Sequence, residues 1–352
     1  MTYSEPVPAT MPKTAPTLSL STAALFAAFS ILAVYCTSLS LHTIDIDSGT
    51  VAVNLSMSEY RDMLAGVAGF PYQWRMLGSY IVFAGERLTG LAPHQIDLVV
   101  KTLFLFASST LLFLFSRRYT SEAGAYCVIG FYLVLTVAGF IGEQYRIYFT
   151  NDYVMIACWF GAVYAIREER YLAAAALTFV GAWAKETMLL VPVLLAIESI
   201  GSRRARLAFV LSAIAFVIPT AVLRTVYPAP LARWAWWDMV YANVPFLQRS
   251  LYEFRLTIKN NIKVALFYNV FWILAARRAV SIPDRFARHL AMTAVVYLVL
   301  AYPVIYIREL RHFLPLAIVV LPLAINAIEQ RHGVDGRAQR GSATETQRHG
   351  ED

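Results

Sequence analysis

Charged residues are scarce in this chain of 352 residues, where they make up 15% of the sequence against 58% for hydrophobic residues. Apolar runs recur from residue 19 almost to residue 329. A soluble domain has no interior that could bury so many runs long enough to cross a bilayer, so we expect an integral membrane protein. The net charge of +7 is not a nucleic-acid signal, because the arginines lie in short clusters between the apolar runs.

Cysteine is rare as well. Cys36, Cys127 and Cys158 lie within or beside apolar segments and share no metal or redox spacing, so we interpret them as small packing residues. The chain also lacks a serine and histidine pairing suited to nucleophilic catalysis, and its six histidines are scattered. The sequence therefore gives no support to an intramembrane protease or a redox protein.

The apolar runs predict an all-α, polytopic transmembrane bundle. A window of about twenty residues predicts spans at 19–41, 96–116, 123–141, 151–166, 205–227, 262–276, 288–306 and 312–329. The stretch 171–200 is longer than one crossing and carries Lys185 and Glu186 at its middle, which indicates two short helices with "AKET" at the turn. Counting this pair, we expect about ten membrane helices joined by extracytoplasmic and cytoplasmic loops.

The ends of the chain differ from its middle. Residues 1–18 are rich in proline, threonine and serine, and residues 330–352 are polar and lack periodicity. We expect a transmembrane domain at 19–329 between two disordered cytoplasmic segments, 1–18 and 330–352.

Basic clusters predict the orientation. The clusters are Arg117 with Arg118, Arg167 with Arg170, Arg203 with Arg204 and Arg206, Arg277 with Arg278, and the tail from Arg331. Placing all of them in the cytoplasm puts both termini there and requires that residues 76–90 form an interfacial amphipathic helix rather than a span. The predicted location is the cytoplasmic (inner) membrane, with multiple passes.

An acidic pair, Asp45 and Asp47 in "IDID", lies where the chain leaves the first predicted span. Residues two apart in an extended segment face the same side, so both carboxylates could address one divalent cation or one acceptor group. The alternative is a solvated acidic pair. The sequence assigns no metal ligands, and the cofactor stays open, with a divalent cation as the one candidate.

Other unusual polar residues fall on the same predicted outer face. They are Arg75 in "FPYQWRMLGSY", Glu143, Arg146 and Asp152 in "GEQYRIYFTND", Lys185 and Glu186 in "GAWAKET", and Arg308, Glu309, Arg311 and His312 in "YIRELRHFLPL". We treat all of them as candidate substrate-binding residues.

The energetic cost of a charge inside a membrane segment supports a binding role for these residues. An ionised group at the centre of a membrane helix costs about 2.5–3.5 kcal/mol, so Lys185 and Glu186 should face a cavity or opposite charges, or each other in a salt bridge. Arg308, Arg311 and His312 could bind a phosphate or pyrophosphate, or could only snorkel to the interface. Arg75 could meet anionic lipid or an acidic partner, or anchor an aromatic belt.

The layout resembles the GT-C class of integral membrane glycosyltransferases, in which an acidic motif like "IDID" follows the first helix of a polytopic chain. The resemblance implies transfer of a sugar from a polyprenyl-phosphate carrier to an acceptor at the outer face, with Asp45 or Asp47 as catalytic base or metal-associated carboxylate. We add Lys185, Arg308 and Arg311 as cations for the leaving phosphate. The expected partners are membrane lipid and a polyprenyl-phosphate-linked sugar, and no nucleic acid. The alternatives are a transporter or flippase for lipid-linked saccharides and a non-catalytic membrane scaffold.

Overall fold

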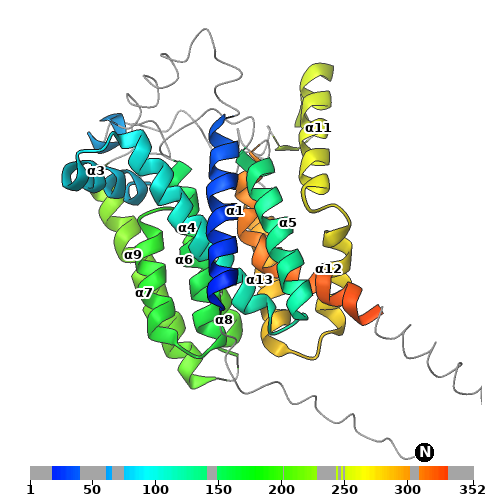
Figure 1. The fold of residues 1–352 in the computed structure, drawn as a ribbon. Coiled ribbons are helices and arrows are strands. Elements are labelled where there is room, and N and C mark those ends of the chain that lie inside the picture. Colours follow the sequence, from blue (N-terminus) through cyan, green and yellow to red (C-terminus); the bar gives the residue numbers. More distant parts are fainter. Residues whose placement is uncertain are drawn as a thin grey trace, which may run out of the picture.

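The computed structural model describes residues 18–39, 61–65, 75–140, 149–200, 202–227, 243–244, 247–248, 250–301 and 309–331. Within these ranges every regular element is a helix, as the sequence predicts (Figure 1). The helices are α1 (Leu20–Leu39), α3 (Leu77–Thr89), α4 (Pro93–Ser116), α5 (Glu122–Phe140), α6 (Thr150–Arg167), α7 (Tyr171–Ala182), η3 (Glu186–Leu189), α8 (Leu190–Glu198), α9 (Arg203–Val226), α11 (Leu251–Tyr268), α12 (Val270–Ser281), α13 (Arg285–Ala301) and η5 (Leu310–Leu316). A further helix continues from η5 over residues 317–331. The two predicted terminal segments lie almost wholly outside the described residues.

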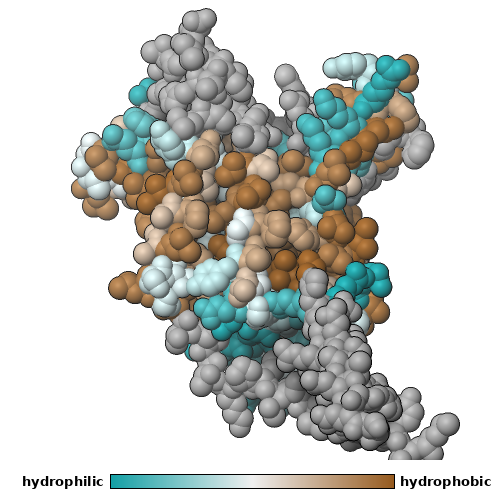
Figure 2. All heavy atoms as spheres, turned by 45° about the vertical axis from the view of Figure 1, so that its right-hand side comes forward, coloured by the Kyte–Doolittle hydropathy of each residue, from teal (hydrophilic) through white to brown (hydrophobic). Residues whose placement is uncertain are grey.

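In the described part of the chain, five helices are long and apolar enough to cross a membrane. They are Leu20–Thr37, Pro93–Ser116, Glu122–Phe140, Arg203–Val226 and Leu310–Arg331. A sixth is added if α11 and α12 form one bent span. The surface in view in Figure 2 matches this assignment, because hydrophobic residues cover the middle of that face and hydrophilic residues gather towards its lower end and its upper right. An all-helical membrane protein is therefore supported.

Three predicted spans differ from the structure. The segments 151–166 and 288–306 form α6 and α13, which are not among these candidate spans, and 262–276 is not continuous. The expected continuous helix at 262–276 is broken, because α11 ends at Tyr268 and α12 begins at Val270 with a bend of 60° between them. Asn269 lies at the break with a φ of 49°. Asparagine tolerates positive φ better than most residues with a side chain, so it suits this position.

The centre of the bundle is α6, which α4 and α7 enclose and which also contacts α3, α8 and η5. Nearly all its side chains are buried, from Thr150 to Ile166. A helix that is apolar around most of its circumference belongs in the interior of a bundle. Its first turn carries the polar run Thr150, Asn151 and Asp152, which places three polar side chains inside the protein.

The predicted pair of short helices is confirmed. α7 ends at Ala182, the "AKET" residues follow, and η3 and α8 lead back. Both outer ends of the pair lie at the same end of the bundle. Glu168, just before α7, forms an ion pair with Arg118, and the carbonyl of Ile200, just after α8, accepts a hydrogen bond from Arg285. The chain therefore enters and leaves the bundle at one end, and the turn with Lys185 and Glu186 lies towards the opposite end.

Several of the predicted basic clusters gather at this same end. Arg118 pairs with Glu168, Arg167 lies 2.6 Å from Asp284, and Arg278 Nε donates to Asn326 Oδ1 over 2.5 Å. Clustering of basic loops on one side is the expected pattern for a membrane protein. The first turn of α6 lies at the other end, because Asp152 and Arg167 are separated by about 22 Å along the helix at 1.5 Å per residue. We call these the arginine end and the Asp152 end.

Candidate functional site

Side chains from four separate segments converge at the Asp152 end. Arg75 precedes α3, Asp152 lies in the first turn of α6, Lys185 and Glu186 occupy the turn after α7, and the fourth segment is the start of η5. The fourth segment contributes Glu309, Arg311 and His312. The structure thus brings together seven of the candidate residues that the sequence analysis singled out. The remaining candidates, Asp45, Asp47, Glu143, Arg146 and Arg308, lie outside the described residues.

Asp152 lies at the centre of the cluster and pairs with two cations. Its Oδ1 accepts a hydrogen bond from Lys185 Nζ, and its Oδ2 lies 3.2 Å from Arg311 Nε. The three side chains are 6%, 3% and 1% exposed, respectively. One carboxylate therefore compensates two buried cations, which is a costly arrangement unless further partners are present.

Glu309 supplies the second carboxylate. Its Oε2 accepts a hydrogen bond from Arg311 Nη2 and lies 2.9 Å from His312 Nε2. The other ring nitrogen, Nδ1 of His312, is 3.2 Å from Lys185 Nζ. A lysine ammonium can only donate, so Nδ1 accepts and Nε2–H donates to Glu309, which describes a neutral imidazole. His312 thus links the Lys185 and Glu309 parts of the cluster.

The surroundings hold Glu309 ionised. Partial burial raises the pKa of its carboxyl, but the hydrogen bond from His312 and the positive charge of Arg311 outweigh that effect and lower the pKa to about 2. A carboxylate of this acidity is a weak proton acceptor at neutral pH. Glu309 is therefore suited to pairing with cations rather than to general-base catalysis.

This pKa predicts an acid dependence of stability. The pKa of Glu309 is lowered on folding from 4.5 to about 2, so the carboxylate stabilises the folded protein above pH 4.5, and this contribution is lost as the pH falls towards 2. Lys185, Arg311 and His312 face Glu309. We expect Glu309→Gln to flatten the fall in thermal unfolding midpoint between about pH 5 and about pH 3. An unchanged pH profile in the Gln variant would contradict the assignment.

Arg75 and Glu186 form the exposed edge of the cluster. Arg75 Nε donates to Glu186 Oε2 over 3.2 Å and its Nη2 donates to Oε1, a two-pronged contact that fixes the guanidinium in the plane of the carboxylate. The Glu186 side chain is 53% exposed while that of Arg75 is 9% exposed. This pair connects the buried cations to the surface.

The charges of the cluster balance. Arg75, Lys185 and Arg311 contribute three positive charges, and Asp152, Glu186 and Glu309 contribute three negative charges. Much of the cluster can therefore be understood as an ion-pair network that stabilises the bundle end. The exception is the Arg311 guanidinium, because its buried Nη1 has no hydrogen-bond partner within the described ranges. The guanidinium carbon lies 3.7 Å from the centre of the Phe149 ring, which fixes its plane without using its N–H groups.

Sequence reasoning did not single out Asn151, which positions Arg75. The Asn151 side chain accepts from Gly78 N over 2.7 Å and donates to the carbonyl of Arg75 over 2.8 Å, so it holds α3 against α6. A Cβ at Gly78 would lie 2.9 Å from the backbone nitrogen of Asn151, which leaves room only for glycine. The run "TND" at the start of an apolar segment was the available signal.

A second buried pair, Asp97 and Lys101 on α4, was also missed. Lys101 Nζ donates to Asp97 Oδ2 over 2.6 Å, and the hydroxyl of Thr150 donates to Asp97 Oδ1. Successive residues of α6 therefore reach three different partners: α4, α3 and the cation cluster. The spacing of four between Asp97 and Lys101 was a usable signal, because such residues share a helix face.

The close contact at Gly78 predicts different effects for two glycine-to-alanine substitutions. We expect Gly78→Ala to destabilise the protein by about 1–3 kcal/mol, since the added methyl group meets backbone rather than a flexible side chain. Gly130 on α5 has open space at its Cβ, so Gly130→Ala should be neutral or stabilising by up to about 1 kcal/mol. Thermal unfolding of both variants in mild detergent tests this, and equal effects would contradict the close packing of α3 on α6.

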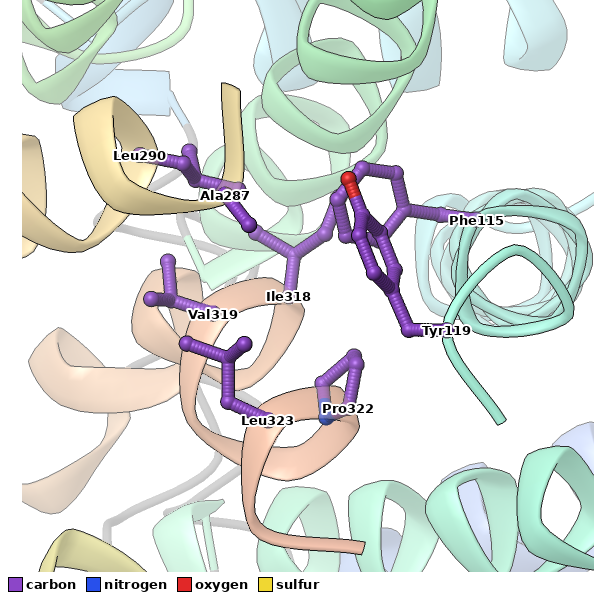
Figure 3. Close-up of a pocket in the computed structure, with 8 residues that line it drawn as sticks. All are labelled: Phe115, Tyr119, Ala287, Leu290, Ile318, Val319, Pro322 and Leu323. Carbon is purple, nitrogen blue, oxygen red and sulfur yellow. The ribbon is translucent and has the colours of Figure 1, made fainter. Parts of the chain in front are cut away.

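A small cavity lies elsewhere, where residues 317–331 pack against α13 and the end of α4. Figure 3 shows its lining, which consists of Phe115, Tyr119, Ala287, Leu290, Ile318, Val319, Pro322 and Leu323. Its volume of ≈ 10 Å³ is enough for about one water molecule. The Tyr119 hydroxyl is buried there with no partner among the described residues. The cavity is too small and too apolar to be a substrate site.

Comparisons with known proteins give no match from which the role of the site could be inferred. The chain matches no protein-family model, no curated protein and no solved structure. In the described part of the chain, no group of three or more His, Cys, Asp or Glu side chains is placed to hold a metal ion. The described site is an ion-pair network in which Arg311 Nη1 has no hydrogen-bond partner among the described residues.

Proposed function

We propose that this chain is an integral membrane glycosyltransferase that moves a sugar from a polyprenyl-phosphate donor to an acceptor at the extracytoplasmic face. The observation that carries the proposal is the pair of buried cations, Lys185 and Arg311, at the end of the bundle opposite the arginine end. Among the residues that the structure describes, Nη1 of Arg311 has no hydrogen-bond partner. A buried guanidinium with unused donors is suited to a phosphate group.

The proposed roles follow from charge. Transfer of the sugar leaves negative charge on the phosphate of the carrier, and fixed cations in a dry site stabilise that charge as it develops. Arg311 and Lys185 would supply them, with Arg308 as a third. The described Glu309 is too acidic to take the proton of an acceptor hydroxyl, so that role stays with Asp45 or Asp47, with or without a divalent cation.

The proposal includes an orientation. Basic loops favour the cytoplasm, so the arginine end would face the cytoplasm and the Asp152 end would face outward. In this arrangement the chain has about ten membrane helices in the inner membrane, extracytoplasmic loops around the site, and both termini in the cytoplasm. The short α3, which Figure 1 shows at the end of the bundle beside α4, fits an interfacial position.

The experiment is a turnover assay on purified protein in proteoliposomes, with polyprenyl-phosphate-linked sugars as donors and release of polyprenyl phosphate as the readout. We expect Asp45→Asn or Asp47→Asn to reduce release by about 10²-fold or more. Asp62→Asn is the matched control, because Asp62 is exposed and lies in the same predicted outer loop. Equal rates in all three variants would contradict a catalytic role for the acidic pair.

A transporter for lipid-linked saccharides is the second candidate. The break between α11 and α12 and the short pair α7 and α8 are discontinuous helices of the kind that transporters use around a binding site. A transporter needs the cations of the site but no catalytic base. It would move lipid-linked sugar across the bilayer at an unchanged rate in the Asp45→Asn variant.

A further inference from the structure

Glu309 differs from the other carboxylate that faces Arg311. The Asp152 side chain is 6% exposed and belongs to the rigid first turn of α6, whereas the Glu309 side chain is 21% exposed and precedes η5 with extended backbone angles. Of the two carboxylates, Glu309 is the more exposed and lies just before its helix rather than within one.

The contacts of Glu309 are those of a bound phosphate oxygen. One carboxylate oxygen, Oε2, receives a guanidinium N–H from Arg311 and an imidazole N–H from His312. Phosphate oxygens accept the same charge-assisted hydrogen bonds from arginine. The carboxylate leaves Arg311 Nη1 without a partner within the described part of the chain, while a tetrahedral phosphate has further oxygens to offer.

We propose that Glu309 is a built-in substitute for the ligand: its carboxylate occupies the position beside Arg311 and His312 that a phosphate group takes on binding, and it moves towards solvent when the ligand arrives. The inference rests on the proposed function for the identity of that ligand as the phosphate of a membrane lipid. The shared chemistry is a phosphate group, whether it belongs to a lipid or is free in solution.

Charge balance supports the exchange. Removal of Glu309 from the cluster leaves one positive charge in excess among the buried groups around Asp152. A lipid phosphate, whether a monoester or a phosphodiester, carries at least one negative charge and so replaces the charge of Glu309. Because buried cations are stable only when paired, the exchange replaces one partner by another and leaves the packed bundle unchanged.

The test uses Glu309→Gln, which keeps the shape of the side chain and removes the competing charge. We expect it to bind polyprenyl phosphate in lipid nanodiscs more tightly than the unmodified protein, by on the order of tenfold. Glu168→Gln is the matched control: the Glu168 side chain is also 21% exposed and pairs with an arginine, Arg118, but at the arginine end. Its affinity should be unchanged. Glu309→Asp, which keeps the charge on a shorter side chain, should also tighten binding and serves if the Gln variant does not fold.

Two probes distinguish the sources of phosphate. Tightening for polyprenyl phosphate alone indicates a lipid ligand, and tightening for inorganic phosphate as well indicates a site for the phosphate group itself. Unchanged or weaker binding of both probes by the folded Glu309 variants overturns the inference. The proposed function is tested separately. Tighter binding without any turnover would contradict the transferase activity but support the role of Glu309 as a substitute for the ligand. Turnover without tighter binding would support the transferase activity but contradict that role of Glu309.

Discussion

Asp152→Asn is expected to lower the free energy of unfolding by about 3–5 kcal/mol, because it removes one partner of a buried ion pair and leaves the other charge uncompensated. Asp152 is the carboxylate that Lys185 and Arg311 share, and none of the three side chains is more than 6% exposed. Asparagine has nearly the same shape as aspartate, so the loss of stability reflects the removed charge rather than altered packing. Thermal unfolding in mild detergent, followed by circular dichroism, gives the measurement.

A double variant makes this expectation specific. Lys185→Met removes one of the two buried cations and leaves Arg311 with Glu309, so the pair of changes Asp152→Asn and Lys185→Met balances the charge again. We expect the double variant to be more stable than Asp152→Asn alone, with a coupling energy within about 0.5–3 kcal/mol. An Asp152→Asn protein as stable as the unmodified one would show that the cluster is not a buried ion-pair network.

Arg311→Lys is expected to reduce the proposed sugar transfer by about 10²-fold while leaving the protein folded. Lysine keeps the positive charge beside Asp152 and Glu309, so the ion pairs can persist. It loses the planar fork, the contact with the Phe149 ring at 3.7 Å and the spare Nη1, which are the features that suit a phosphate. The readout is release of polyprenyl phosphate together with the thermal unfolding midpoint.

A control at the arginine end separates function from stability in this experiment. Arg167→Lys makes the same change in an arginine that lies 2.6 Å from Asp284, about 22 Å along α6 from Asp152. We expect it to keep full turnover. A purely structural role for Arg311 predicts instead that Arg311→Lys and Arg167→Lys have equal effects on turnover.

Sequence reasoning predicts the helices of this fold well because apolar length alone identifies them. The helices α4, α5 and α9 coincide with the expected spans within a few residues, and the charges in "AKET" correctly separate α7 from α8. The break at Asn269 was not predictable in the same way, since a single residue with positive φ leaves the apolar pattern intact. Local backbone geometry of this kind is decided by packing between helices.

Seven of the candidate residues meet in the structure, but the sequence did not predict which of them pair. Charged residues in an apolar chain gather where they can be paired, so Lys185, Glu186 and Arg311 were identified from their positions alone. Their partners could not be predicted, because Asp152 and Lys185 are 33 residues apart and meet only through the packing of α6 against α7 and η3. The sequence left open whether Lys185 and Glu186 face a cavity, opposite charges or each other. The structure pairs Lys185 with Asp152 and Glu186 with Arg75.

The most direct test of the central claim, an outer-face site for a lipid-linked phosphate, is native mass spectrometry of the protein purified in mild detergent. We predict a co-purifying polyprenyl phosphate or its sugar adduct, retained less in Arg311→Lys and retained more in Glu309→Gln. A protein that carries only ordinary phospholipid, with the same lipid content in both variants, would contradict the claim and favour a non-catalytic membrane scaffold.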